Sequence, residues 1–434
     1  MVSITSTNNT ADLIKNDSQA GLSSSSRRMV MIWLFGMLAL LPVKIFHFPF
    51  NMELMDFWIF MALPIFLLTY SARRQTPISW AYTPVIVFIF AVSFISVFVA
   101  PNPAKGLIVI AKEIYLFIWF LMMTAFLSTL NERDMRRVMV IWSAVAVLHG
   151  LFIIAQFLSP ALWLFTKSIT GNVEVYDHYR SPGLFPNANS AAFSQLMGFV
   201  PLVLAKYSAP VAIGLGICLF LSILGTGSMG ATIGALLGLS VALFTILVLS
   251  KKKITIPKYF GPLLVTMTVL GGVFLFVVGQ NEVYQKRLES IVFGRADRSS
   301  GGRFNLWERG IDVFLEHSGF FWGVGPENFR EIDGKDKQLH NDFLAFAVER
   351  GLLSVIALAL FGVIAFSRAL YLFRTCSVSS GLNVVVFMSA VVAMLIESLT
   401  HQIFHYRELW VVLAAQEAMI FKRQQLLHLN KKGK

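Results

Sequence analysis

The stretch from Thr83 to Leu127 decides the fold, because it holds two apolar runs separated by one short turn. Residues 83–100 read TPVIVFIFAVSFISVFVA, a turn with two prolines follows at Ala100-Pro-Asn-Pro103, and residues 106–127 read GLIVIAKEIYLFIWFLMMTAFL. Each run is close to the roughly 20 residues that an α-helix needs to cross the hydrocarbon core of a bilayer. The pair therefore predicts two transmembrane helices joined on one side of a membrane.

The same pattern recurs along the whole chain of 434 residues, of which 56% are hydrophobic and only 14% are charged. Soluble domains carry about a quarter of charged residues. We therefore predict an all-α polytopic membrane protein with about twelve transmembrane helices and a large extracytoplasmic loop that contains interfacial helices. The expected spans cover residues 29–47, 56–71, 83–100, 106–127, 138–158, 188–205, 210–226, 230–250, 260–279, 351–373, 381–400 and 407–421.

Basic residues predict the orientation of these spans. Arg27-Arg28, Arg73-Arg74, Lys251 to Lys253 and Lys422-Arg423 all fall on the same side of the membrane if the expected spans are correct. Short cytoplasmic loops carry the excess of Lys and Arg, so we expect both termini in the cytoplasm. The formal charge of +12 then reflects topology, and no nucleic-acid partner is needed to explain it.

These expectations divide the chain into five parts. The predicted parts are a disordered cytoplasmic tail over residues 1–28, transmembrane helices one to nine within 29–279, a large periplasmic loop over 280–350, transmembrane helices ten to twelve within 351–421, and a cytoplasmic tail over 422–434. A second, shorter outer loop is expected over 159–187. Long loops are translocated largely regardless of their charge, so the cations of the large loop do not contradict the topology.

The shorter outer loop ends in Tyr179-Arg180-Ser-Pro-Gly183-Leu-Phe185-Pro-Asn187-Ala-Asn189-Ser190. The polar residues from Asn187 to Ser190 offer caps for the helix that re-enters the membrane. Two readings of Arg180 remain open. Its side chain either extends to lipid headgroups or presents a planar guanidinium to a phosphate at the membrane surface.

In the large loop, residues 304–315 predict an amphipathic helix with Trp307, Ile311, Phe314 and Leu315 on one face. Arg303 comes at the start of this helix, where a cation opposes the helix dipole unless an anion is nearby. That position favours a ligand-binding role for Arg303 over a solvated one. Arg309 and Arg330 are interpreted as structural residues.

His340 is the strongest catalytic candidate, and it precedes Asn341 and Asp342, which are suited to cap the tenth span. A lone interfacial histidine is more often structural. However, a neutral imidazole is suited to accept a proton from a sugar hydroxyl near neutral pH, and Arg303 lies close along the chain.

Other polar groups favour structural roles. Glu397, His401 and His405 are spaced by one helical turn, which suits a metal ion but favours a hydrogen-bonded Glu–His helix end. Glu53 and Asp56 are candidates for a base or for a divalent-ion site, and a solvated helix end explains them equally well.

Taken together, these residues resemble the O-antigen ligase family, which shares a signature with many O-antigen and exopolysaccharide polymerases. The order of the motifs carries the resemblance. They are Arg180-x-x-Gly183-x-Phe185-x-Asn187, Gly302-Arg303 with Trp307, Gly323-x-Gly325, His340-Asn341-Asp342-x-Leu344 and Glu349-Arg350-Gly351.

The resemblance implies an inverting glycosyltransferase in a bacterial inner membrane that moves a glycan from undecaprenyl pyrophosphate to an acceptor hydroxyl at the periplasmic face. It implies that Arg180 and Arg303 hold the pyrophosphate and that His340 is the base, with no metal ion and no cofactor. It implies no role for Arg287. The favoured acceptor is lipid A–core, as in lipopolysaccharide assembly.

Three alternatives stay open beside this ligase. The first is a polymerase that extends carrier-linked repeats. The second is a twelve-span transporter or flippase, although the chain shows no repeated halves and concentrates its charge in the outer loops. The third is a metal-dependent transferase that uses Glu53 or Asp56.

Overall fold

The computed structural model describes residues 23–44, 53–70, 80–170, 180–245, 301–316, 319–334, 338–375 and 378–432, and every regular element within them is a helix. The prediction of an all-α membrane protein is thereby confirmed. The helices at expected spans are α2 (Ser24–Leu40), α3 (Leu54–Phe60), α4 (Ala62–Tyr70), α5 (Thr83–Val97), α6 (Pro103–Thr129), α7 (Glu132–Leu158), α9 (Ala188–Met197), α10 (Phe199–Leu204), α11 (Ala209–Thr226), α12 (Met229–Phe244), α19 (Leu352–Thr375), α20 (Val378–Ser398) and α21 (Arg407–Lys432). The helices in the predicted outer loops are α8 (Pro160–Thr170), α15 (Gly301–Glu316), α16 (Gly319–Trp322), α17 (Phe329–Asp333) and α18 (Asp342–Arg350).

The number of membrane crossings stays a prediction. In the described part of the chain, α6, α7, α11 and α19 are long and apolar enough to cross a bilayer, and several shorter apolar helices accompany them. The expected span 260–279 lies outside the described residues. At the two ends of the chain, α2 begins at Ser24 and α21 continues to Lys432, so both helices extend into the segments expected to be tails.

Polar residues set the ends of the long helices. The side chain of Asn102 accepts a hydrogen bond from the amide of Lys105 at 3.3 Å, and Pro103 takes the first helical position of α6, where its missing N–H costs nothing. The side chain of Asn131 caps α7 in the same way, accepting from the amide of Asp134 at 2.8 Å. The Asn131 cap starts α7 directly after α6 ends at Thr129, so only one short turn separates the two helices.

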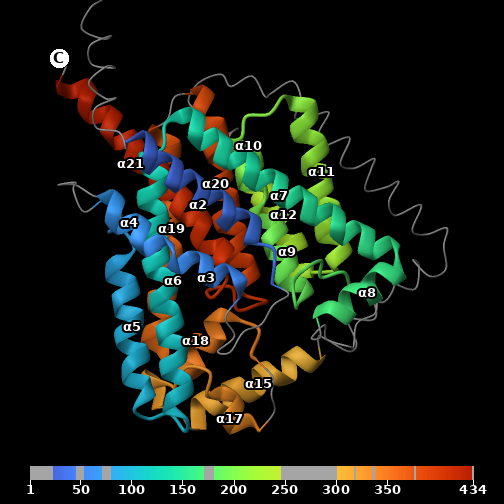
Figure 1. The fold of residues 1–434 in the computed structure, drawn as a ribbon. Helices are drawn as coiled ribbons and strands as arrows, with labels where there is room; N and C mark the ends of the chain where they lie inside the picture. Colours follow the sequence, from blue (N-terminus) through green and yellow to red (C-terminus); the bar gives the residue numbers. More distant parts are fainter. Residues whose placement is uncertain are drawn as a thin grey trace, which may run out of the picture.

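The helices pack into one bundle, with α15, α17 and α18 beneath one end of it (Figure 1). The backbone amide of Asn102 donates to the side chain of Asn328 at 2.7 Å, which joins the start of α6 to α17. At the other end of α6, Arg27 lies 3.5 Å from Asp134, and Lys422 contacts the carbonyl of Leu130. Three of the segments predicted to be cytoplasmic, all within the described residues, thus meet at the end away from α17, which is consistent with the predicted topology.

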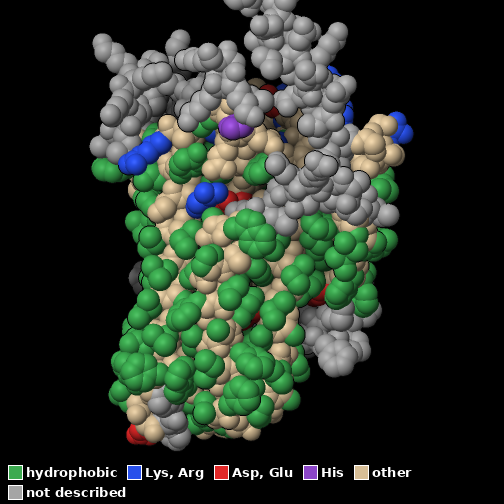
Figure 2. Space-filling view, turned by 90° about the vertical axis from the view of Figure 1, so that its left-hand side faces the viewer, with side chains coloured by type: hydrophobic (Ala, Val, Ile, Leu, Met, Phe, Trp, Pro, Cys, Tyr) green, Lys and Arg blue, Asp and Glu red, His purple; other side chains and the backbone are tan. Residues whose placement is uncertain are grey.

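The side of the bundle formed by α4 and α5 carries a broad apolar surface. Figure 2 shows hydrophobic side chains over most of this face. On α5, Phe88, Phe94 and Phe98 are all exposed. Contiguous apolar surface of this extent marks a protein or membrane interface, and here it fits contact with lipid.

The helix expected over 304–315 is present as α15. Leu306 and Val313 are buried where α15 packs on α18, whereas Ile311 and Leu315 are 48% and 72% exposed, as a face turned toward lipid allows. One prediction about the large loop needs correction. Asn341 and Asp342 begin α18, a separate helix, and not the tenth span, because the chain turns at Gly351 with a φ of 80° before α19 starts.

Candidate functional site

His401 is held between a carboxylate and a guanidinium in the loop of residues 399–406, which connects α20 to α21. Its Nδ1 lies 2.9 Å from Oε1 of Glu397, and its Nε2 lies 3.3 Å from Nη2 of Arg303. A guanidinium only donates hydrogen bonds, so Nε2 accepts and Nδ1 carries the proton. His401 is 3% exposed and Glu397 is fully buried. The contacts therefore assign one neutral tautomer to this imidazole.

Glu397 and His401 form the expected Glu–His pair at the end of α20, with Oε1 and Nδ1 in close contact. The second histidine of the motif, His405, points elsewhere, with its Nε2 2.7 Å from Oε1 of Glu113. His401 and His405 do not contact the same carboxylate, because α20 ends at Ser398 and helical spacing no longer applies beyond it. Among the described residues, no three His, Cys, Asp or Glu side chains converge as metal ligands.

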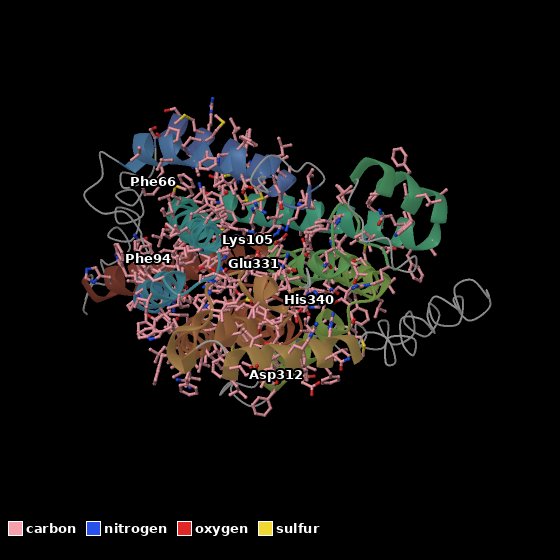
Figure 3. All side chains as sticks on the ribbon, turned by 90° about the horizontal axis from the view of Figure 1, so that it is seen from below. Phe66, Phe94, Lys105, Asp312, Glu331 and His340 are labelled. Atoms are coloured by element: carbon pink, nitrogen blue, oxygen red, sulfur yellow. The ribbon has the colours of Figure 1, made fainter. Side chains whose placement is uncertain are left out.

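His340 lies beside this pair, with its ring centroid 6.2 Å from that of His401. Its backbone φ of 50° falls in the left-handed region, which a residue with a side chain rarely adopts. The indole of Trp307 donates to the carbonyl of Leu339 at 2.9 Å and so ties α15 to the residue before His340. Seen from below in Figure 3, His340 lies toward the middle of the molecule, whereas Asp312 lies at its edge.

The 399–406 loop is fastened to α18 and α9. The backbone amide of Ile403 donates to Oδ2 of Asp342 at 2.9 Å, and the hydroxyl of Ser190 donates to that of Tyr406 at 2.9 Å. Burial raises the pKa of Asp342 to about 8 despite the backbone hydrogen bonds that it accepts. These contacts hold the loop of His401 beside the helix that follows His340.

Arg180 is fixed at a neighbouring junction of helices. Its Nε donates to the carbonyl of Thr226 at 2.9 Å, and its Nη2 contacts the side chain of Asn189. The side chain of Asn187 caps α9 as expected, accepting from the amide of Asn189 at 2.7 Å. The guanidinium is thus turned toward α9 and the end of α11.

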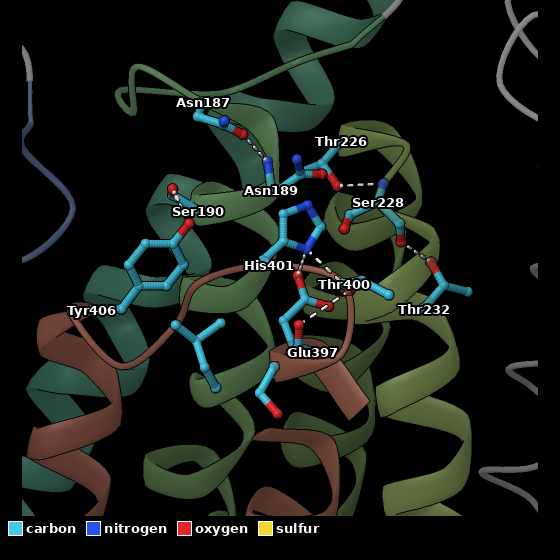
Figure 4. Close-up of polar contacts among 12 residues, drawn as sticks. Asn187, Asn189, Ser190, Thr226, Ser228, Thr232, Glu397, Thr400, His401 and Tyr406 are labelled. Carbon is cyan, nitrogen blue, oxygen red and sulfur yellow. Dashed lines mark hydrogen bonds and ion pairs between the residues drawn. The ribbon is translucent and has the colours of Figure 1, made fainter. Parts of the chain in front are cut away.

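The junction at Arg180 and the Glu397–His401 pair belong to one polar cluster. A Cβ added to Gly230 would lie 2.2 Å from Oγ1 of Thr400 and 2.4 Å from Oε2 of Glu397, so the start of α12 lies directly on the end of α20. Figure 4 shows His401 in the same group of polar side chains as Asn189 and Thr226, the two residues that Arg180 contacts. The structure therefore brings Arg180, Arg303 and His340 to one region.

A buried ion pair anchors the other end of α18. Nη1 of Arg350 lies 3.0 Å from Oε2 of Glu113 on α6, and its guanidinium lies 4.2 Å from the centre of the Phe346 ring. Sequence periodicity could not have indicated this pair, because the two residues are 237 positions apart along the chain. The pair positions α18, and with it the segment of His340, against the bundle.

The glycines of the Gly323-x-Gly325 and Gly351 motifs have a structural reason. The amide of Gly325 donates to the carbonyl of Glu349 at 2.8 Å, so two backbone segments lie directly against each other. A Cβ on Gly323 would lie 2.3 Å from the amide nitrogen of Arg350, and one on Gly351 would lie 2.0 Å from the carbonyl oxygen of Phe321. Only glycine fits at these two positions.

The remaining candidates are engaged in structural contacts. Arg309 lies 3.0 Å from Asp333, and Arg330 lies 3.4 Å from Glu327, which agrees with their structural interpretation. Arg287 lies outside the described residues. The last two candidates, Glu53 and Asp56, both contact Arg407, at 2.7 and 2.6 Å.

The contact between His401 and Arg303 was not predicted. The spacing of His401 from Glu397 was visible in the sequence, but the partner that distinguishes it, Arg303, is 98 positions away along the chain. Helical periodicity predicts neighbours within one helix and says nothing about such distant contacts.

Residues 214–361 match the family model described as O-antigen ligase, which confirms the predicted resemblance and supports an enzyme. The matched region runs from α11 into α19 and contains Arg303 and His340, whereas Arg180 precedes it and His401 follows it. No curated protein matches the sequence.

Proposed function

We propose that this chain, whose residues 214–361 match the O-antigen ligase family, transfers a glycan from undecaprenyl pyrophosphate to an acceptor hydroxyl at the periplasmic face of the inner membrane. The favoured acceptor is lipid A–core, which makes the reaction the ligation step of lipopolysaccharide assembly. The observation that carries the proposal is the gathering of Arg303, His340 and His401 in one polar cluster, with Arg180 held at its margin.

The two arginines are the proposed pyrophosphate ligands. Arg180 and Arg303 are both partly buried, and each carries a planar guanidinium with five N–H donors. A guanidinium binds phosphate oxygens in a bidentate manner, and such charge-assisted bonds strengthen where water is excluded. As the bond between the anomeric carbon and the pyrophosphate breaks, the negative charge that grows on the leaving group is neutralised.

We assign His401 as a positioning residue for Arg303. Its Nε2 accepts from the guanidinium only while the imidazole is neutral, and Glu397 holds the tautomer that makes this possible. A carboxylate that accepts from Nδ1 orients a histidine in the same manner in hydrolases and metal sites. Arg303 is therefore held at the start of α15, beside the proposed pyrophosphate.

His340 is the proposed general base. Its left-handed backbone costs about 1 to 3 kcal/mol, and such strain is found most often at functional sites. The imidazole removes the proton of the acceptor hydroxyl while the hydroxyl oxygen attacks the anomeric carbon. Attack opposite the departing pyrophosphate inverts that carbon. Pyrophosphate is a good leaving group, so the mechanism requires no general acid and no cofactor.

The ligase and the polymerase differ only in the acceptor, so the acceptor decides between them. The full-length protein, reconstituted in proteoliposomes, receives carrier-linked glycan together with either lipid A–core or further carrier-linked repeats. We expect lipid A–core to be glycosylated. Extension of the carrier-linked repeats alone would identify a polymerase, and movement of the donor across the bilayer without a new glycosidic bond would identify a flippase.

The proposal of a metal-independent reaction is tested in the same assay. Arg180 and Arg303 supply the positive charge that a divalent ion supplies in many other transferases, so EDTA is expected to leave the initial rate unchanged. If EDTA abolished transfer and Mg²⁺ or Mn²⁺ restored it, this part of the proposal would be wrong.

A further inference from the structure

A hollow of about 920 Å³ lies between the first halves of α2 and α7. It is far from the proposed catalytic site, because α7 begins where α6 ends, and α6 extends about 40 Å from its contact with α17. The mouth of the hollow is polar and its deeper wall is apolar. The polar lining consists of Ser24, Arg27, Arg28, Asn131, Arg133, Asp134, Arg136 and Arg137, and the apolar lining of Met31, Ile32, Phe35, Val140 and Ile141.

Positive charge dominates the mouth. Five arginines face one carboxylate, that of Asp134, which lies 3.5 Å from Arg27 and 3.3 Å from Arg137. Arg28 and Arg133 are exposed. One carboxylate balances only one of these charges, so the mouth keeps a strong positive potential.

Two helices also begin at this hollow, and both point the positive ends of their dipoles toward it. The side chains of Ser23 and Asn131 each cap one backbone amide, at 3.1 and 2.8 Å. Cations in the first turns of a helix are unfavourable unless an anion is present. The positive-inside rule explains why arginines lie on this side of the membrane, but not why five of them converge on a hollow at two helix starts.

We propose that this hollow binds the phosphate headgroup of an anionic phospholipid from the cytoplasmic leaflet. The change from polar to apolar lining runs in the same direction on both helices, and Phe35 lies about 10 Å deeper than Arg28 along α2. A phosphate at the mouth therefore places its acyl chains against Ile32, Phe35 and Ile141. The site is independent of the proposed glycan transfer and depends only on the predicted orientation of the bundle.

The test compares two double variants of the full-length protein in nanodiscs. Arg28→Gln with Arg133→Gln removes two charges from the hollow, and Arg374→Gln with Arg423→Gln removes two from the same end of the bundle outside it. Native mass spectrometry then measures retained phosphatidylglycerol. Each arginine near an anionic lipid adds to the binding free energy, so the loss of two is expected to weaken phosphatidylglycerol binding about 30-fold. For the control pair, phosphatidylglycerol binding is expected to stay within about twofold of wild type.

Two further probes identify what is bound. Phosphatidylcholine should be retained far less than phosphatidylglycerol, and glycerol 1-phosphate, which has the headgroup chemistry without acyl chains, should not displace the lipid at equal concentration. Equal retention of both lipids, efficient displacement by glycerol 1-phosphate, or the same loss in both double variants would each overturn the proposal.

Discussion

Replacing His401 by two different amides separates its two hydrogen bonds. In His401→Asn, the side-chain amide stands near the place of Nδ1 and still donates to Glu397, but the acceptor for Arg303 is lost. In His401→Gln, the longer side chain brings its carbonyl oxygen near the place of Nε2 and keeps the acceptor for Arg303. A comparison of the two variants therefore tests whether His401 acts through Arg303.

The expected loss of rate follows from the hydrogen bond between Arg303 and His401. A hydrogen bond to a charged group contributes about 1.5 to 3 kcal/mol, and the 3.3 Å separation of Arg303 and His401 places it at the lower end. About 1.5 kcal/mol corresponds to a roughly tenfold change in rate. Complete loss of Arg303 as a donor to the leaving group would cost about 10² to 10³ in kcat, which sets the upper limit.

The assay is the initial rate of glycan transfer in proteoliposomes as a function of donor concentration. We expect kcat/KM to fall about tenfold in His401→Asn and to stay near wild type in His401→Gln, with both rates measured at a temperature at which the variants are folded. If both variants were inactive while the donor still bound, His401 itself would be the base and the assignment of His340 would be refuted.

Three further perturbations test the supporting structure. Burial raises the pKa of Asp342 to about 8, so the folded state holds a proton that the unfolded state releases at about pH 4, and thermal stability should fall as the pH rises between these values. Asp342→Asn should flatten this pH dependence in a melting assay, and an unchanged slope would exclude Asp342 as its source. Arg350→Met should destabilise the fold by about 3 to 5 kcal/mol, because it leaves the carboxylate of Glu113 buried without its guanidinium, and the double variant with Glu113→Leu should recover much of the loss. Gly351→Ala should reduce the yield of folded protein more than Gly334→Ala, a matched control where φ is also positive but the added Cβ meets nothing within 4 Å; equal yields would contradict the close approach of Phe321.

The sequence predicted most of the bundle because long apolar runs and capping residues are local signals. The expected spans 106–127 and 138–158 are present as α6 and α7, although both helices begin earlier, at Pro103 and Glu132. The sequence motifs alone indicate Arg180, Arg303 and His340. For α15, the sequence predicted the helix and its apolar residues but not the residues that pack on α18. Leu306 and Val313 are buried there, and the sequence of α15 alone does not show where α18 lies.

The contacts that assemble the site could not be predicted in this way. Arg350 contacts Glu113, which is 237 positions away along the chain, and Arg303 contacts His401, which is 98 positions away. Neither distance leaves a periodic signal in the sequence. The separate helix α18 was also missed, because the expected tenth span begins at residue 351 and the short, partly charged segment before it has no span-length apolar run.

The central claim is that His340 activates the acceptor while the arginines hold the donor. Single-turnover glycan transfer by His340→Ala, measured beside an independent determination of donor binding, tests it most directly. Loss of a general base should slow the chemical step by about 10² to 10⁴, with donor affinity unchanged. Transfer at the wild-type rate would contradict the assignment of His340, and a loss of donor binding of the same size would show that His340 binds the donor and is not the base.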